Sequence, residues 1–330
     1  MNAMVLSSIG SLLKLTSVPV PEIDPSQVLL KVHTCGICRT DLHILDGELT
    51  GSNLPLVLGH QIVGTAVKLG RDIKNIKVGD KIGVPWLSST CCNCEYCNSG
   101  QENLCDKAKF TGYNLNGGFA EFASANEQFC FKLPNDTDNI NTAPLLCGGL
   151  IGYRALNMAG EGVNIGLYGF GSAAHIITQA TVFLGKSIFA FTRSGDKKGQ
   201  QFAKKLGAVW AGSSLDFPLV KLDAAIIFAP VGSLVPQALK AVRKGGRVIC
   251  AGIHMSDIPS FPYKDLWEER SIQSVANLTR KDGEEFLSIA LQIPIKTKVE
   301  VFPLAKANEA LDALRKGRIK GSGVLVIDQD

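Results

Sequence analysis

The pattern of apolar and polar residues changes near Gly152. Beyond that point, short apolar runs alternate with segments whose apolar residues recur every three or four positions, the spacing of one helix face. The runs predict strands at residues 164–168, 187–191, 224–228 and 247–251. The periodic segments predict helices at residues 173–184, 197–206 and 234–242. Strands that alternate with helices are typical of an α/β fold with a parallel, doubly wound sheet.

Residues 1 to about 150 lack this alternation and are rich in turn residues. They contain short apolar runs at residues 28–32 and 62–67. Residues 78–84 have the pattern of a turn that leads into a strand. We therefore expect an irregular, β-rich domain in this part of the chain.

The last part of the chain predicts one more helix and one more strand. One helix face carries the apolar residues Leu304, Ala307, Ala310, Leu311 and Leu314. Gly317 follows at the position of a C-terminal cap, and residues 324–327 form an apolar strand. The pattern alone does not assign this segment to either domain.

Composition describes a globular protein with two domains. The length of 330 residues exceeds what one hydrophobic core usually supports. The net charge is only +4 and basic runs are absent, so we expect no nucleic-acid partner. The apolar runs are too short to cross a membrane. Because no secretory signal precedes the ten cysteines, we expect reduced thiols and metal ligands in a cytoplasmic protein.

Cysteines form a first group with the spacing of a structural zinc site. The run C-x2-C-x2-C-x7-C consists of Cys91, Cys94, Cys97 and Cys105. Four protein ligands close a tetrahedral zinc ion. A nucleic-acid-binding zinc ribbon is the alternative, but the run is not two separated C-x2-C pairs and its flanks are not basic.

A second group offers only three ligands, Cys38, His60 and Cys147. Two thiolates and an imidazole suit zinc, and three ligands leave a position open for an alcohol or carbonyl oxygen. Each residue taken singly reads more simply as a buried core residue. The motif that surrounds these residues is therefore what distinguishes a zinc site from a hydrophobic core.

A glycine turn indicates a dinucleotide site. Gly169-x-Gly171-x-x-Ala174 follows a predicted strand and opens a predicted helix, where a pyrophosphate can rest on the helix N-terminus. Ala174 takes the place of the third glycine.

The end of the next strand favours NADP(H). Thr192 and Arg193 stand where NAD enzymes place an acid for the ribose hydroxyl, and a planar guanidinium suits a 2′-phosphate. The alternative is NAD(H), with Asp196 making the ribose contact.

The residues around the three-ligand group resemble a known family. Residues 36–43, followed by Gly59 and His60, look like the catalytic-zinc signature of the zinc-dependent alcohol dehydrogenases of the medium-chain dehydrogenase/reductase family. Residues 143–149 are similar to their third-ligand segment, and residues 252–286 resemble a bacterial, propanol-preferring-type branch. The resemblance covers essentially the whole chain.

The resemblance implies the domain organisation. A GroES-like catalytic zinc domain would comprise residues 1–150 and 288–330, and a Rossmann dinucleotide-binding domain residues 151–287. It also implies a homodimer or a homotetramer with two zinc ions per chain.

The resemblance further implies a proton relay. Thr40 would hydrogen-bond the alcohol and pass its proton through the cofactor ribose to His43, an exposed imidazole that returns it to solvent. Asp41 would orient His60 through the other ring nitrogen. On residue type alone, Thr40 reads more simply as a helix cap and His43 as a surface histidine, whereas Asp41 reads equally as an N-cap.

Other family positions concern the cofactor and the substrate. Arg39 would meet the pyrophosphate, and Gly252 and Ile253 would lie beside the nicotinamide. The substrate-pocket walls would include Trp86 and Leu87.

The chain departs from the family pattern at two positions. Gln61 replaces the usual Glu after the ligand histidine. A neutral amide cannot act as a transient anionic zinc ligand, so we expect zinc exchange and water displacement to differ from those of the family. Ser322 replaces a late pyrophosphate arginine, and Arg280 is a candidate substitute.

These observations favour a zinc-dependent alcohol dehydrogenase that oxidises small primary alcohols and reduces aldehydes with NADP(H). One alternative is an NAD-dependent alcohol or polyol dehydrogenase, although polyol enzymes usually have a carboxylate where Cys147 stands. The other is a non-catalytic dinucleotide-binding redox sensor, which needs no proton relay.

Overall fold

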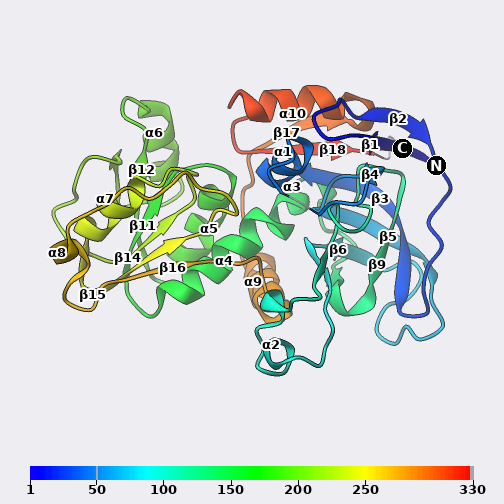
Figure 1. The fold of residues 1–330 in the computed structure, drawn as a ribbon, viewed down its shortest axis with the longest axis horizontal. Helices are drawn as coiled ribbons and strands as arrows, with labels where there is room; N and C mark the ends of the chain where they lie inside the picture. Colours follow the sequence, from blue (N-terminus) through cyan, green and yellow to red (C-terminus); the bar gives the residue numbers. More distant parts are fainter. Residues whose placement is uncertain (50, 328–330) are drawn as a thin grey trace. The chain divides into compact units, whose positions relative to one another are not determined.

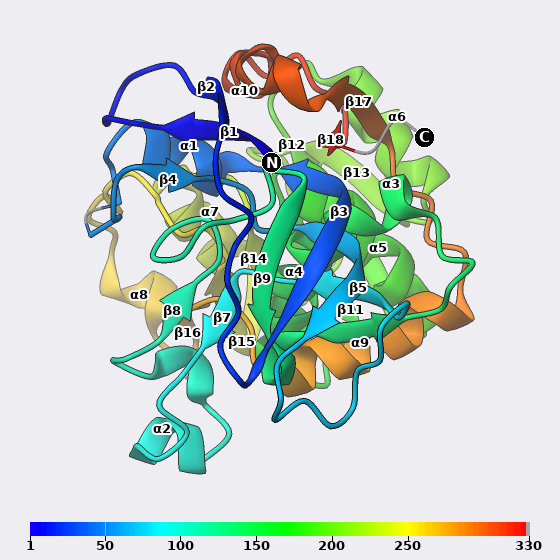
Figure 2. The same ribbon diagram turned by 90° about the vertical axis from the view of Figure 1, so that its right-hand side faces the viewer.

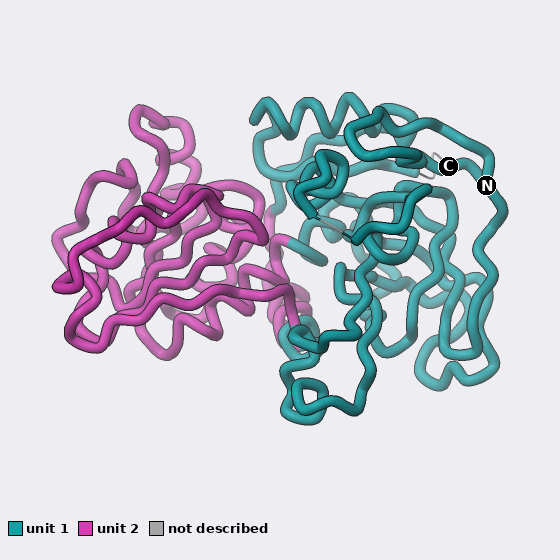
Figure 3. Tube along the Cα trace, in the orientation of Figure 1, with its two compact units in different colours: residues 1–147, 279–284, 297–330 teal, residues 148–278, 285–296 magenta. Residues whose placement is uncertain are grey.

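The computed structural model describes residues 1–49 and 51–327 and divides into two compact units (Figure 3). Unit 1 contains Met1–Cys147, Thr279–Glu284 and the chain from Thr297 onward, and unit 2 contains Gly148–Leu278 and Glu285–Lys296. The chain therefore passes between the units four times, whereas the division expected from sequence has two passages. Every described helix is too short or too polar to reach across a bilayer.

Unit 2 is built on a parallel sheet with the strand order β13-β12-β11-β14-β15-β16 (Figure 1). The strands are β11 (Asn164–Tyr168), β12 (Ser187–Thr192), β13 (Trp210–Ser213), β14 (Leu222–Ile227), β15 (Val242–Cys250) and β16 (Ser271–Ser274). In chain order this is 3-2-1-4-5-6, the arrangement of dinucleotide-binding sheets. The doubly wound fold is thereby confirmed.

Helices of unit 2 pack against this sheet. They are α4 (Gly148–Ala159), α5 (Ser172–Phe183), α6 (Lys197–Lys205) and α7 (Leu234–Ala241), and the short α8 (Tyr263–Leu266) contacts α7. The apolar periodicity predicted α5, α6 and α7 to within a residue or two of their ends. Their buried faces, such as Ile176 and Ile177 of α5, are the apolar stripe that the sequence shows.

Helix α4 was not predicted because glycines interrupt its pattern. A Cβ on Gly149 would lie 2.3 Å from the ring of Phe286, and one on Gly152 would lie 3.0 Å from Ile177. These glycines lower helix propensity but allow neighbouring elements to approach closely. Helix α9 (Arg280–Gln292) was also missed.

Strand β3 (Gln27–Ile37) is the centre of unit 1. It pairs antiparallel with β5 (Ile62–Leu69), β9 (Phe122–Asn126) and β18 (Ser322–Val326), and Figure 2 shows β5 and β9 on either side of it. The sheet continues through β6 (Lys81–Val84), β10 (Phe131–Leu133) and β17 (Val299–Pro303). The C-terminal strand thus belongs to unit 1.

Smaller elements complete unit 1. Two further sheets consist of β1 (Asn2–Leu6), β2 (Lys14–Ser17) and β4 (Leu56–Val57), and of β7 (Leu87–Ser89) and β8 (Lys109–Phe110). The helices are α1 (Arg39–Leu45), α2 (Glu95–Asn98), α3 (Asn139–Thr142), α10 (Ala307–Arg315) and the 3-10 turns η1 (Glu102–Leu104), η2 (Glu127–Phe129), η3 (Ala143–Leu146) and η4 (Leu304–Lys306).

Candidate metal centres and dinucleotide site

The start of α1 positions two of the predicted site residues. Cys38 is the N-cap, and its Sγ accepts a hydrogen bond from the Thr40 amide at 3.4 Å. Asp41 reaches back, and its Oδ2 accepts from the Cys38 amide at 2.8 Å. This reciprocal capping box orients the Cys38 sulfur and the Asp41 carboxylate through the helix start.

The three separated residues of the open group meet in unit 1. Cys38 Sγ lies 3.1 Å from His60 Nε2 and 4.0 Å from Cys147 Sγ, and the three ligand atoms all lie within 4.8 Å of one another. Ligands on a common tetrahedral zinc ion are about 3.5 to 3.8 Å apart. The donor set and its spacing therefore fit a zinc ion.

The two thiols of this group interact directly, since Cys147 Sγ donates to Cys38 Sγ at 4.0 Å. The hydrogen bond from Cys147 is the main reason that the pKa of Cys38 lies well below its usual value, and the same bond raises the pKa of Cys147. The two thiols thus differ in acidity, with Cys38 the more acidic. Metal binding at such a pair releases any thiol proton still present.

Asp41 lies behind His60. Its Oδ1 is 3.4 Å from His60 Nδ1, and both side chains are buried. Burial raises the pKa of Asp41. Burial alone would lower the pKa of His60, but the charges of Cys38 and Asp41 outweigh it and raise that pKa. Among the described residues, neither Oδ1 nor Nδ1 has a hydrogen-bond partner with good geometry, so each faces the other.

The four-cysteine group is also assembled. Cys94 Sγ lies 3.5 Å from Cys97 Sγ, Cys91 Sγ lies 3.9 Å from Cys97 Sγ, and all four sulfurs are within 4.8 Å of one another. This spacing fits a tetrahedral zinc ion. The backbone amide of Asn93 is the main group that lowers the pKa of Cys91, to about 6. The segment around α2 projects from the rest of unit 1 in both views (Figures 1 and 2).

Arg280 has a partner that the sequence did not reveal. Its amide and its Nε both donate to Glu102 Oε1, at 2.9 and 3.2 Å, and its guanidinium lies 5.3 Å from the centre of the Phe129 ring. Glu102 is buried and stands three residues before Cys105. The candidate role of Arg280 at a pyrophosphate thus gives way to a contact within unit 1 that holds the four-cysteine segment.

An aromatic cluster flanks His60. The Trp86 ring centre lies 6.3 Å from that of His60, and Trp86 stacks on Phe110 at 4.2 Å. The ring centre of Tyr113 lies 6.3 Å from that of Trp86. Leu87 is fully buried in β7, so Trp86 is the predicted pocket residue that lies next to the open group. Phe110 and Tyr113 were not among the residues predicted from sequence; the pairing of β7 with β8 brings them close.

His43 and Gln61 are both enclosed. His43 is only 9% exposed, which corrects the expectation of an exposed imidazole. Its Nδ1 contacts Glu48 Oε2. Gln61 is buried against Gly36, where a Cβ would lie 2.4 Å from the Gln61 amide oxygen. The glycine of the signature therefore makes room for Gln61.

The glycine turn of unit 2 has the geometry of a phosphate site. Gly169 has a φ of 91°, and a Cβ there would lie 3.0 Å from the Ala229 nitrogen. Gly171 is the N-cap of α5, and a Cβ built on it would meet no described atom within 4 Å. The helix N-terminus is thus open to a ligand. Ala174 is fully buried, where a larger residue would not fit.

The end of β12 separates Thr192 from Arg193. The Thr192 hydroxyl is buried and donates to backbone carbonyls, including that of Gly212 at 3.3 Å. Arg193 is exposed, and no described residue makes a hydrogen bond or ion pair with its side chain. Asp196 caps α6, accepting from the Gly199 amide at 2.9 Å. Its carboxylate is therefore already engaged.

The remaining predicted cofactor residues lie on the two units separately. Gly252 and Ile253 follow β15 in unit 2, and Ile253 is 45% exposed. Arg39 is exposed at the first position of α1 in unit 1. Ser322 is neutral and buried at the start of β18. This position therefore supplies no cation for a pyrophosphate.

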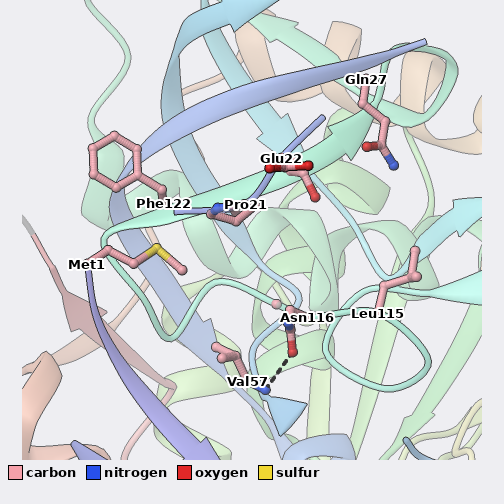
Figure 4. Close-up of a pocket in the computed structure, with 11 residues that line it drawn as sticks. Met1, Pro21, Glu22, Gln27, Val57, Leu115, Asn116 and Phe122 are labelled. Carbon is pink, nitrogen blue, oxygen red and sulfur yellow. Dashed lines mark hydrogen bonds between the residues drawn. The ribbon is translucent and has the colours of Figure 1, made fainter. Parts of the chain in front are cut away.

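A surface pocket in unit 1 lies apart from these groups (Figure 4). The Asn116 side chain in its wall accepts from the Val57 amide at 3.0 Å. Its lining includes Met1, Pro21, Glu22 and Phe122, and among the described residues it contains none of the predicted site residues. The candidate chemistry is therefore elsewhere.

Comparisons with known proteins agree with the fold. A family profile described as "Alcohol dehydrogenase GroES-like domain" matches residues 24–135. "Probable alcohol dehydrogenase AdhA" of Mycobacterium tuberculosis (strain CDC 1551 / Oshkosh) is 42% identical over 316 residues, which is 93% of this chain and 91% of that protein.

Two solved structures share the fold. CAD from Helicobacter pylori complexed with NADP(H) has a TM-score of 0.89 and 22% identity, and covers 100% of this chain and 98% of its own. Acetophenone reductase from Geotrichum candidum NBRC 4597 in complex with NAD has a TM-score of 0.88 and 27% identity, with the same coverage.

Fold, metal-ligand clusters and relatives together define an oxidoreductase of the alcohol dehydrogenase class. The chain belongs to the zinc-dependent alcohol dehydrogenases of the medium-chain dehydrogenase/reductase family.

Proposed function

We propose that this enzyme transfers hydride reversibly between a small primary alcohol or aldehyde and NADP(H). The observation that carries the proposal is the meeting of Cys38, His60 and Cys147 at zinc-ligand spacing, with three ligands rather than four. A zinc ion held there would supply Lewis acidity toward an alcohol or carbonyl oxygen. The four-cysteine group would hold a second, structural zinc ion.

The chain's own residues would orient the metal ligands and move the proton. Asp41 fixes the His60 ring by facing its Nδ1. Thr40 and His43 lie one helical turn apart on α1, which supports the relay that the family implies. Thr40 would hold the alcohol hydroxyl, and His43 would carry the released proton away. Trp86 and Phe110 would exclude water beside His60.

The preference for NADP(H) rests on the end of β12. Solved relatives of this fold bind NADP(H) in one case and NAD in another, so the comparison does not separate them. The side chain of Arg193 is exposed, whereas the Asp196 carboxylate caps α6. An exposed guanidinium without an acid beside it suits a 2′-phosphate. Gly169, Gly171 and the N-terminus of α5 would receive the pyrophosphate, with Arg39, Gly252 and Ile253 as further cofactor residues.

The cellular setting is part of the proposal. The cysteines of the described chain are all free thiols, which fits a reducing cytoplasm. A homodimer or homotetramer is the assembly expected of the family.

Initial rates of short-chain aldehyde reduction, measured with NADPH and with NADH side by side, test the function. We expect turnover with a strong preference for NADPH. Activity should disappear with a zinc chelator and return with added zinc. Preference for NADH would overturn the cofactor assignment alone, and no rate with either nucleotide would overturn the proposed function.

A further inference from the structure

The His43 imidazole is too enclosed to release a proton directly to bulk water. Its side chain is only 11% exposed, and α1 buries it together with Asp41, Leu42, Ile44 and Leu45. A relay that delivers a proton to this ring therefore needs a second group to take the proton onward. The structure places a carboxylate at that point.

Glu48 contacts the His43 ring at Nδ1. Its Oε2 lies in hydrogen-bond contact with His43 Nδ1, and its side chain is 44% exposed. The chain after α1 holds it there, because the Glu48 amide donates to the His43 carbonyl at 2.9 Å. Gly47, with a φ of 77°, permits the turn that makes this return possible. One carboxylate thus reaches from the enclosed ring to solvent.

The other charged groups around this helix end are engaged with one another. Arg315 of α10 forms a two-point contact with Asp46, at 2.5 and 2.7 Å. The Asp46 hydrogen bond is the main reason that the pKa of Arg315 is raised, and Glu48 contributes a smaller attraction. Asp312 of α10 pairs with Lys316 and Arg318. Among the described residues, the ion-pair partner of Glu48 is His43.

We propose that Glu48 is the proton outlet of the relay and the positioning residue of His43, an inference that rests on the proposed function. During alcohol oxidation a proton enters His43 at its other ring nitrogen. The Nδ1–H bond then breaks, an O–H bond forms on the Glu48 carboxylate, and Glu48 passes the proton to water. Aldehyde reduction runs the same transfers in reverse, so atoms and charge balance in both directions.

Glu48→Gln tests the outlet because it keeps a hydrogen-bond acceptor but cannot carry the proton as a carboxylate. We expect kcat for alcohol oxidation to fall about tenfold, less than the roughly 10²- to 10⁴-fold effect of a direct proton donor, with little change in KM. Added imidazole or formate, at fixed pH and ionic strength, should restore much of this loss. Glu48→Asp should retain more activity than Glu48→Gln.

The matched control is Asp46→Asn, which removes a carboxylate two residues away that binds Arg315 instead. Its kcat should match that of the native enzyme and should not respond to added buffer. A readout independent of turnover is the ring N–H proton of His43 in NMR spectra. We expect a strongly hydrogen-bonded resonance in the native protein that disappears in Glu48→Ala.

Native kcat and no buffer response in a folded Glu48→Gln protein would overturn the inference while leaving the dehydrogenase function intact. An unchanged His43 N–H resonance in Glu48→Ala would overturn the positioning role. If the native protein itself shows no dehydrogenase turnover, the proposed function fails, and the outlet fails with it.

Discussion

Asp41 Oδ1 lies 3.4 Å from His60 Nδ1 in a fully buried position, while Asp41 Oδ2 caps the helix that presents Cys38. One carboxylate therefore supports two of the three candidate zinc ligands. This dual contact explains why a charged group is retained with no exposed surface. Asp41 is not the N-cap considered from sequence, because Cys38 takes that position and Asp41 is its N3 partner in the capping box.

Asp41→Asn should weaken zinc binding at the open group. The amide keeps one acceptor for the cap but loses the charge that faces His60, and loss of such a partner typically costs about 10- to 100-fold in metal affinity. Competition with a chromophoric chelator measures this affinity. Native affinity in the variant would show that Asp41 acts only as the cap.

Arg193→Glu should weaken NADPH binding far more than NADH binding. Hydrogen bonds between charged groups contribute about 1.5 to 3 kcal/mol, so the ratio of the two KM values should shift by roughly tenfold to 100-fold. Lys205→Glu is the control, because Lys205 is an exposed cation in the last turn of α6, the helix that follows Arg193. Equal effects of Arg193→Glu on both nucleotides would rule out the 2′-phosphate contact.

Local pattern predicted α5, α6 and α7 of unit 2 because each of these helices buries one regular face, but it did not predict α4, β13 or β16. The α5 stripe of Ile176, Ile177 and Ala180 is fully buried, as its spacing predicts. Helix α1 gave a weaker signal since its cap is the Cys38 thiol rather than a serine or threonine. Helix α4 could not be predicted from its sequence, because its glycines lower helix propensity. Close packing against Phe286 and Ile177 favours these glycines instead.

Contacts between distant residues could not be predicted from local pattern. Arg280 and Glu102 are 178 positions apart, and no spacing rule relates them. The enclosure of His43 likewise depends on tertiary packing around α1. By contrast, the metal ligands were recognisable from sequence. Zinc accepts few residue types as ligands, and three of the four clustered cysteines are only three positions apart.

Cys97→Ser should remove zinc from the four-cysteine group and destabilise its segment. Only three thiolates would remain, and structural zinc binding is itself folding free energy. Metal analysis should show one zinc ion fewer per chain, and thermal unfolding should occur at lower temperature. Cys92→Ser is the matched control, since Cys92 is exposed and lies outside the cluster. Unchanged zinc content in Cys97→Ser would contradict the assignment.

The contact between Glu102 and Arg280 should make stability depend on pH. Burial would raise the pKa of Glu102, but the Arg280 amide and guanidinium outweigh it and lower that pKa below 4.5. A group with a lowered pKa in the folded state stabilises it above its unfolded pKa. This stabilisation is lost as the pH falls through the lower, folded value.

Glu102→Gln should therefore be less stable than the native protein by about 1 to 3 kcal/mol at neutral pH. The difference should remain constant down to about pH 5 and shrink below the unfolded glutamate value near 4.5, because the native carboxylate is then protonated as well. Urea unfolding at a series of pH values measures it. Glu95→Gln, an exposed change in the same segment, should show no such difference. A native–Glu102→Gln gap that stayed constant well below pH 4 would show that charge is not what Glu102 contributes.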